Sequence, residues 1–145
     1  MVGSVVFRIE RRCPLPAAEA WRRVTDWERH AALVPLTTAV VTGERSFTAR
    51  TGLGRVAVDD PMEIVRWEPP DADRPGRCRL EKRGRTVLGW AEIEVWPGED
   101  GGSRVVWRED VRVRPLPRAF DRPTQWAGRL LFGRALDGLL ARAHQ

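Results

Sequence analysis

Cysteine and histidine are scarce in this sequence, and their scarcity limits the chemistry that it can support. The only cysteines are Cys13 and Cys78, and the only histidines are His30 and His144. The cysteines share no metal-ligand spacing with the histidines, so we expect no metal site. Two cysteines without such spacing are typical of a reduced protein, and we therefore predict a cytoplasmic location.

Long apolar runs are also missing. No stretch approaches the length of a membrane-spanning helix, although 42% of the residues are hydrophobic. The first residues, MVGSVVFRIERR, lead directly into an alternating strand, so we expect no signal peptide. The 145 residues suffice for one domain with its own core, and we predict a single domain over residues 1–145.

Lysine is nearly absent, because the net charge of +5 is carried by arginine and Lys82 is the only lysine. Acidic residues are interleaved with the arginines, and no block of like charges occurs. Tyrosine is absent, and the seven tryptophans suit packing better than base stacking. We therefore expect no nucleic-acid partner despite the basic composition.

Recognisable catalytic and cofactor motifs are missing as well. The sequence has no phosphate-binding loop, no dinucleotide fingerprint, no zinc pattern and no serine nucleophile elbow with its triad. We therefore expect no cofactor, and the sequence leaves open whether the protein is an enzyme.

What is present begins with a strand and two short helices. Ser4 to Arg12 alternates between apolar and polar side chains, as a half-buried strand does. A helix is predicted from Pro16, whose missing N–H is harmless at the first position of a helix. Thr25 to Glu28 has the form of a capping box, so a second helix is predicted to start there and to end at Pro35.

From Thr38 to Arg114 the sequence indicates consecutive strands joined by turns. Asp59 and Asp60 cannot form a facing pair of carboxylates, because adjacent side chains in a strand point to opposite faces, and we assign them to the turn before Pro61. No helix separates the strands, so we expect an antiparallel meander. The predicted strands are Ala39–Thr42, Ser46–Thr51, Gly54–Val58, Met62–Trp67, Arg77–Lys82, Thr86–Trp96 and Ser103–Val113.

The last predicted element is one long helix from Leu116 to Ala143, and apolar side chains cover most of its circumference. Trp126 and Leu130 point one way, whereas the opposite side carries Phe132, Ala135 and Leu139. Either neighbouring elements cover the helix on several sides, or its outer stripe meets a partner subunit or a membrane. We favour coverage within the fold or a homodimer through this helix, and we do not expect membrane contact.

Several groups of residues carry a resemblance to a known superfamily. They are Pro16–Trp21 with Thr25–Trp27, Asp60–Glu63 with Trp67–Pro70, Trp107–Glu109, and Leu130–Phe132. With these residues and its order of elements, the chain resembles the START-like SRPBCC superfamily and, within it, the polyketide cyclase/dehydrase-like branch. The resemblance covers most of the chain and implies an α+β helix-grip fold of the START/Bet v type. That fold has a seven-stranded curved antiparallel sheet, two short helices after the first strand, and one long C-terminal helix.

The resemblance also implies a deep cavity between the sheet and the long helix. Such cavities take lipids, polyketides, sterol-like or aromatic compounds. Members of the superfamily include binding and transfer proteins as well as aromatase/cyclases, and they share no catalytic motif. The resemblance therefore predicts the fold more specifically than the activity.

Strand alternation predicts which residues of the last strand face this cavity. Val105, Trp107, Glu109 and Val111 share one face, which is the more apolar one. A carboxylate on such a face is costly unless it is satisfied, and its pKa should rise. Two structural explanations would satisfy Glu109: an ion pair with an arginine in the sheet, or a position near the cavity rim where water reaches it. The functional alternative is that Glu109 serves as a general acid/base or as a hydrogen-bond anchor for a ligand.

The preceding strand and the long helix supply further candidates for the cavity. Gly89, Ala91 and Ile93 are predicted to face inward, and the two small residues would leave room for a ligand. Trp126 and Leu130 are the cavity residues predicted for the long helix.

His30 is a second candidate for catalysis, because the second short helix should place it near the cavity mouth. A lone histidine without a partner motif is more often a surface or capping residue. Cys78 is expected to be a small core residue rather than a nucleophile, because no histidine lies near it in the sequence to activate it.

We predict that the protein binds a small hydrophobic or aromatic ligand, similar to a lipid or polyketide, as a carrier or sensor. The alternative is a polyketide cyclase/dehydrase-type enzyme that acts on a poly-β-ketone or aromatic substrate by acid/base catalysis. That enzyme would use Glu109 with His30 or an inward arginine, although the lack of tyrosine weakens this interpretation. A third hypothesis is an interaction protein that uses the outer stripe of the last helix.

Overall fold

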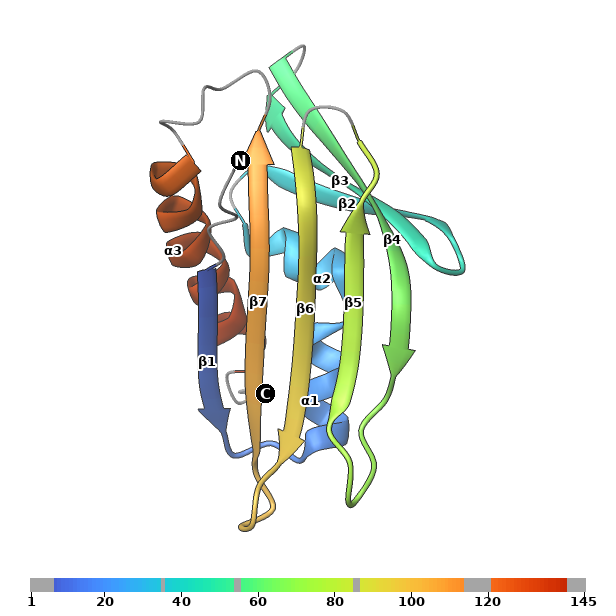
Figure 1. The fold of residues 1–145 in the computed structure, drawn as a ribbon, viewed down its shortest axis with the longest axis vertical. Helices are drawn as coiled ribbons and strands as arrows, with labels where there is room; N and C mark the ends of the chain where they lie inside the picture. The colour runs from blue at the N-terminus through green and yellow to red at the C-terminus, as the bar shows by residue number, and fades with distance from the viewer. Residues whose placement is uncertain (1–6, 35, 54–55, 85–86, 114–120, 141–145) are drawn as a thin grey trace, which may run out of the picture.

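The computed structural model describes residues 7–34, 36–53, 56–84, 87–113 and 121–140. Its strands form one antiparallel sheet in the order β1-β7-β6-β5-β4-β3-β2, so the first strand pairs with the last one (Figure 1). This is the predicted α+β helix-grip fold, which is confirmed. In chain order the elements are β1 (Phe7–Cys13), α1 (Ala17–Val24), α2 (Trp27–Ala32), β2 (Thr37–Gly43), β3 (Ser46–Leu53), β4 (Val56–Glu68), β5 (Gly76–Lys82), β6 (Val87–Pro97), β7 (Ser103–Val113) and α3 (Asp121–Leu140).

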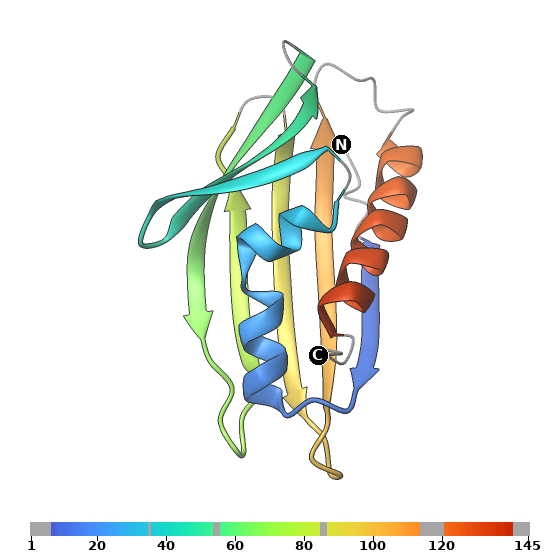
Figure 2. The same cartoon turned by 180° about the vertical axis from the view of Figure 1, so that it is seen from behind.

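The described helices cover the concave face of the curved sheet, as Figure 2 shows from behind. Helix α3 packs along β1 and β7 and also contacts α1 and α2. The core lies between the two layers because each element buries one apolar face there. Its buried members are Phe7, Ile9, Ala20, Trp21, Val24, Phe47, Ile64, Cys78, Leu80, Ala91, Ile93, Val95, Val105, Trp107, Leu136 and Leu140.

The two short helices are separated by two residues with different capping roles. Asp26 is the N-cap of α2, and its carboxylate accepts a hydrogen bond of 3.2 Å from the backbone N–H of Arg29. The predicted capping box had its first residue at Thr25, and this was wrong by one position. The Thr25 hydroxyl instead donates to the carbonyl of Trp21 at 2.7 Å, where α1 ends.

Strand β4 joins two segments that were predicted to be separate strands. The predicted turn at Asp59 and Asp60 is wrong, because both residues pair with β3 inside the continuous strand. Proline has no N–H to donate to a neighbouring strand. The carbonyl of Pro61 faces β5, and its nitrogen faces the same side, because both groups of a residue point the same way in an antiparallel strand. The pairing with β5 begins only at Met62, so the missing N–H is tolerated there. The Pro61 carbonyl accepts from the N–H of Arg83 at 2.7 Å.

Helix α3 confirms the predicted long helix over Asp121–Leu140, and the rest of the predicted range, 116–120 and 141–143, lies outside the described residues. Its buried side carries Ala135, Leu136, Leu139 and Leu140, whereas Trp126, Leu130 and Leu131 are exposed. Among the described residues, no helix combines the length and the apolar character that are needed to cross a membrane.

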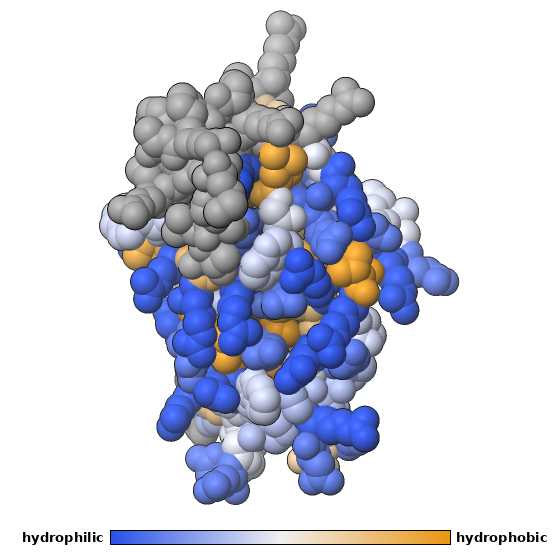
Figure 3. All heavy atoms as spheres, viewed as in Figure 1, coloured by the Kyte–Doolittle hydropathy of each residue, from blue (hydrophilic) through white to orange (hydrophobic). Residues whose placement is uncertain are grey.

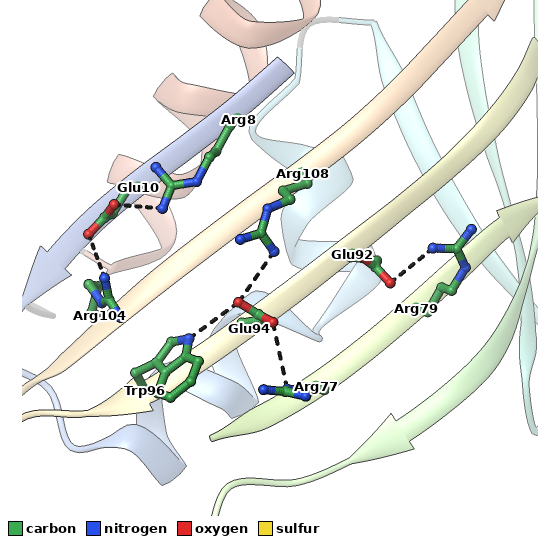
Figure 4. Close-up of polar contacts among 9 residues, drawn as sticks. All are labelled: Arg8, Glu10, Arg77, Arg79, Glu92, Glu94, Trp96, Arg104 and Arg108. Carbon is green, nitrogen blue, oxygen red and sulfur yellow. Dashed lines mark hydrogen bonds and ion pairs between the residues drawn. The ribbon is translucent and has the colours of Figure 1, made fainter. Parts of the chain in front are cut away.

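The convex face of the sheet is largely hydrophilic (Figure 3). Its arginines alternate with glutamates across the strands: Arg79 pairs with Glu92 at 2.9 Å, and Glu94 lies between Arg108 at 3.3 Å and Arg77 at 3.6 Å (Figure 4). Each exposed pair contributes only about 0–1 kcal/mol. The pairs neutralise much of the arginine charge on this face.

Gly89 of β6 occupies a position that suits no other residue. Its φ is +126°, a backbone conformation that L side chains rarely adopt. A Cβ atom at this position would lie 1.7 Å from the backbone oxygen of Asp110 on β7. The prediction that Gly89 leaves room for a ligand is therefore replaced by a backbone requirement: two strands approach too closely for a side chain.

Substitution of Gly89 tests this requirement. We expect Gly89→Ala to lower the free energy of unfolding by about 3 kcal/mol, because clash and backbone strain add. Gly101→Ala is the matched control: φ there is +84°, but a Cβ atom would meet nothing within 4 Å. It should cost only about 1 kcal/mol. Equal losses in urea unfolding would contradict the proposed clash.

Candidate functional site

A cavity of about 300 Å³ lies between the concave face of the sheet and helices α2 and α3. This volume is at the lower end of the range of about 300–1,000 Å³ that is typical of ligand pockets. Its lining is mostly apolar, with a few polar side chains. The lining residues are Trp27, His30, Ala31, Val34, Thr37, Ala39, Phe47, Ala49, Thr51, Asp60, Met62, Leu80, Lys82, Val87, Ala91, Trp107, Glu109 and Phe132.

The structure places four of the residues predicted for the site on the cavity wall. These are His30, Ala91, Trp107 and Glu109, which come from α2, β6 and β7. The other four predicted strand residues do not line the cavity: Val105 and Ile93 lie in the packed core, Val111 packs against that core, and Gly89 meets the backbone of β7. Strand alternation identifies the inward face, but it does not show where along the strand the cavity lies.

The two residues predicted from the long helix lie outside the cavity. Trp126 and Leu130 are 67% and 46% exposed, and α3 turns Phe132 toward the cavity instead. The correction has a simple reason: both sides of this helix are apolar, so its sequence pattern cannot tell which side packs on the sheet.

The polar end of the cavity is a cluster of three charged side chains, Asp60, Lys82 and Glu109. The Lys82 ammonium lies 2.7 Å from Oδ2 of Asp60 and 3.3 Å from Oε2 of Glu109. Oε1 of Glu109 accepts a hydrogen bond of 2.9 Å from the indole N–H of Trp107. We refer to these three residues as the charged cluster. One cation is thus shared between two carboxyl groups in the protein interior.

A small residue on the intervening strand allows the charged cluster to form. Lys82 is on β5 and Glu109 is on β7, so β6 lies between them. In the register of β6, Ala91 stands opposite both Leu80 and Glu109. Because Ala91 carries only a methyl group, the long side chain of Lys82 can reach across β6 to the carboxylate. Ala91 lines the cavity together with Lys82 and Glu109.

Burial and charge act against each other on the groups of this cluster. Burial raises the pKa of Glu109, and the nearby Lys82 ammonium and the Trp107 N–H only partly oppose it. Burial likewise raises the pKa of Asp60 against the effect of Lys82. For Lys82, burial alone would lower the pKa, but the two carboxylates outweigh it and the pKa is raised. The lysine therefore stays charged, and the carboxyl groups hold protons more readily than exposed ones do.

Sequence reasoning missed Lys82 and Asp60, although a signal for Lys82 was present. One of the alternatives left open for Glu109 was a pairing with an arginine, whereas its partner is the only lysine of the chain. Cys78 was expected to face inward, and Lys82 shares its parity on β5 with Cys78 and Leu80. No comparable signal was available for Asp60, because Pro61 indicated a turn there.

His30 is buried on α2 beside the aromatic wall of the cavity. Its ring lies 4.8 Å from that of Trp107 and 5.8 Å from that of Phe132, measured between centroids. Its Nε2 atom has no hydrogen-bond partner among the described residues. Burial lowers its pKa from 6.5 to about 4, so the imidazole is neutral at neutral pH. It can therefore give or accept a hydrogen bond without bringing a charge.

The two cysteines are free, and neither is among the described residues that line the cavity. Cys78 is buried, and burial raises the pKa of its thiol to about 12, so it is no thiolate nucleophile. Cys13 is a free cysteine that contacts the Ser103 hydroxyl at 3.1 Å. Within the described part of the chain, no group of three or more His, Cys, Asp or Glu side chains could hold a metal ion.

Comparison with known proteins shows the family of this chain. The profile of the family described as polyketide cyclase / dehydrase and lipid transport matches residues 4–144. The chain belongs to this family. No curated protein sequence matches the chain significantly.

Solved structures show the same helix-grip fold as this family member, at low sequence identity. The protein TTHA0849 from Thermus thermophilus aligns with a TM-score of 0.73 and 18% identity over 93% of this chain and 94% of its own. A START superfamily protein from Mycobacterium smegmatis has a TM-score of 0.70 and 12% identity, with 93% and 96% covered. The ZhuI aromatase/cyclase from Streptomyces sp. R1128 has a TM-score of 0.65 and 15% identity, with 94% and 91% covered. At these identities the likeness shows the fold alone.

The burial of His30 predicts a pH dependence of stability. Its pKa is about 4 in the folded protein and about 6.5 when unfolded, so the unfolded state binds the proton first as the pH falls. The buried neutral imidazole contributes its full stabilisation above pH 6.5. As the pH falls toward 4 this contribution is lost, and the free energy of unfolding decreases by roughly 3 kcal/mol. Urea unfolding of the wild type and of His30→Phe across this range measures it.

The difference in the free energy of unfolding between the wild type and His30→Phe separates the effect of the histidine from that of the buried carboxyl groups. The raised pKa values of Asp60 and Glu109 act in the opposite direction, because acidification favours their buried protonated forms. These contributions are common to the wild type and the variant and therefore cancel in the comparison. Parallel pH profiles for the two proteins would show that His30 does not titrate as proposed.

Proposed function

We propose that this family member binds a small hydrophobic or aromatic ligand in the cavity, as a carrier or sensor. The observation that carries the proposal is an apolar cavity of about 300 Å³ with a charged cluster at one end. Ligand pockets characteristically combine apolar walls with a few fixed polar groups that orient the bound molecule. The family description, which includes lipid transport, supports the same function.

The aromatic side chains of the wall favour a flat ligand. Trp27 stacks on Phe47 with centroids 4.7 Å apart, and Trp107 stacks on Phe132 with centroids 5.7 Å apart. Both pairs border the cavity from α2 and β3 on one side and from β7 and α3 on the other. Planar ring systems pack well against such surfaces, by stacking or edge-to-face contact.

Filling the cavity tests this function. Ala49 lines the cavity from β3, and we expect Ala49→Phe to occupy ligand space and to weaken binding at least about tenfold, while the fold is kept. The matched control is Ala72→Phe, in the exposed loop between β4 and β5. Native mass spectrometry would compare compounds that co-purify with each protein, followed by extraction and identification. Equal occupancy in both variants would exclude the cavity as the binding site.

A second function is favoured by one observation, the buried carboxyl group of Glu109 with its raised pKa beside the Lys82 ammonium. A buried carboxyl group with a raised pKa is suited to act as a general acid, and its ionised form as a base. The alternative is therefore a polyketide cyclase/dehydrase-type enzyme acting on a poly-β-ketone or aromatic substrate. The family description and the fold shared with an aromatase/cyclase support it.

Glu109→Gln distinguishes the enzyme from the carrier, because the amide keeps the shape of the side chain but cannot transfer the proton. For the enzyme, we expect turnover of a poly-β-ketone substrate to fall at least about 100-fold with little change in affinity. For the carrier, neither protein turns the compound over, and only affinity changes. Glu92→Gln, on the convex face, is the control and should leave both quantities unchanged.

The exposed side of α3 leaves room for a third role. Trp126, Leu130 and Leu131 are exposed together on this helix and would form the contact in a homodimer, which was one of the two arrangements favoured from the sequence. Sedimentation or native mass spectrometry of the purified protein measures its oligomeric state. The cytoplasmic location likewise stays a prediction from composition.

A further inference from the structure

We propose that the polar end of the cavity selects an uncharged ligand that carries a hydroxyl group, such as a phenol, and rejects carboxylates. This inference rests on the proposed function, because it names the chemical class that the same cavity would bind. It is carried by the distribution of charge and of free hydrogen-bonding atoms around the charged cluster.

The first step concerns the cation that a ligand carboxylate would need. Among the described lining residues, Lys82 is the only lysine or arginine. Its ammonium group has three N–H donors, and it already has three acceptors in range: Asp60 at 2.7 Å, Glu109 at 3.3 Å and the thioether sulfur of Met62 at 3.8 Å. A ligand carboxylate would therefore have to displace one of these three acceptors to reach this charge, and it would then lie beside the two protein carboxyl groups.

The second step concerns the charge balance. The cluster holds two carboxyl groups for one ammonium group, so it carries a net negative charge when both are ionised and none when one is protonated. An anionic ligand would either face an excess of negative charge or enter a neutral site without a counterion. Both situations are costly in a buried place, where an unpaired charge loses its hydration.

The third step concerns the polar atoms of the lining residues that have no hydrogen-bond partner among the described residues. Two buried polar atoms of lining residues have no partner among the described residues: Oδ1 of Asp60 and Nε2 of His30. An ionised carboxylate oxygen only accepts hydrogen bonds, and a neutral imidazole nitrogen either donates or accepts. A ligand hydroxyl, which does both, can satisfy such atoms, whereas a buried polar atom left unpaired is unfavourable.

A series of naphthalene derivatives tests the inference on the wild-type protein. Naphthalene, 2-naphthol and 2-naphthoate share one ring system and differ only in the polar group. Near pH 7 a phenol is neutral and a carboxylic acid is ionised. By isothermal titration calorimetry we expect 2-naphthol to bind at least about tenfold more tightly than naphthalene, and 2-naphthoate at least about tenfold more weakly.

The outcomes separate this inference from the proposed function. If 2-naphthoate binds as tightly as 2-naphthol, or if 2-naphthol binds no better than naphthalene, the inference is overturned while the cavity still binds apolar ligands. If none of the three compounds binds, the proposed function itself fails. The expected order of affinities supports both.

A pair of neighbouring variants assigns the selectivity to the cluster. Asp60→Asn removes one negative charge with little change of shape, and we expect it to narrow the ratio of affinities for 2-naphthol and 2-naphthoate about tenfold. Asp59→Asn is the matched control, because Asp59 is exposed and pairs with Arg50 on the other face of the same strand. If this ratio of affinities is the same in the two variants, Asp60 does not contribute to the selectivity. Should Asp60→Asn not fold, the wild-type series still decides the selectivity.

Discussion

The buried contact of the Lys82 ammonium with the carboxyl groups of Asp60 and Glu109 organises the interior of this protein. It joins side chains from β4, β5 and β7, which the sheet brings to one end of the cavity. Removing one partner of a buried ion pair leaves the other charge uncompensated and typically costs about 3–5 kcal/mol of stability. Replacing the whole pair with well-packed apolar residues is often neutral or stabilising. The charged cluster is therefore weak evidence for stability of the fold, and we assign it the proposed role in ligand recognition.

The rest of the cavity is built around this polar end by apolar packing. Helix α2 contributes the neutral His30 and the aromatic ring of Trp27, and α3 contributes Phe132. The side chains of Lys82 and Glu109 are only 3% and 2% exposed, and such burial strengthens the electrostatic interactions within the charged cluster. The same arrangement is compatible with both proposed functions, and the description of the family names both polyketide cyclase/dehydrase and lipid transport.

The elements and their faces could largely be predicted from the sequence, because their signals are local. Alternation in β7 shows that Trp107 and Glu109 share a face, and helical spacing separates Leu139 from Leu130 on α3. The errors share one cause, which is that local patterns carry no information on position in space. Pro61 indicated a turn, because a proline inside a paired strand removes a hydrogen-bond donor. The structure shows that the pairing with β5 begins only after Pro61, and the sequence carries no sign of this. The apolar stripe of Trp126 was assigned to the cavity because both sides of α3 are apolar.

By itself, then, the sequence determined the helix-grip order of elements, the inward faces of β6 and β7, and the presence of a carboxylate on the inward face of β7. Only the tertiary structure decided that the partner of Glu109 is Lys82 rather than an arginine, that Asp60 joins them, and that α3 turns Phe132 inward. The physical reason is that periodicity is a property of neighbours along the chain. Contacts across β6 depend on the register of three strands and on the small size of Ala91, and these join residues that are far apart in the sequence.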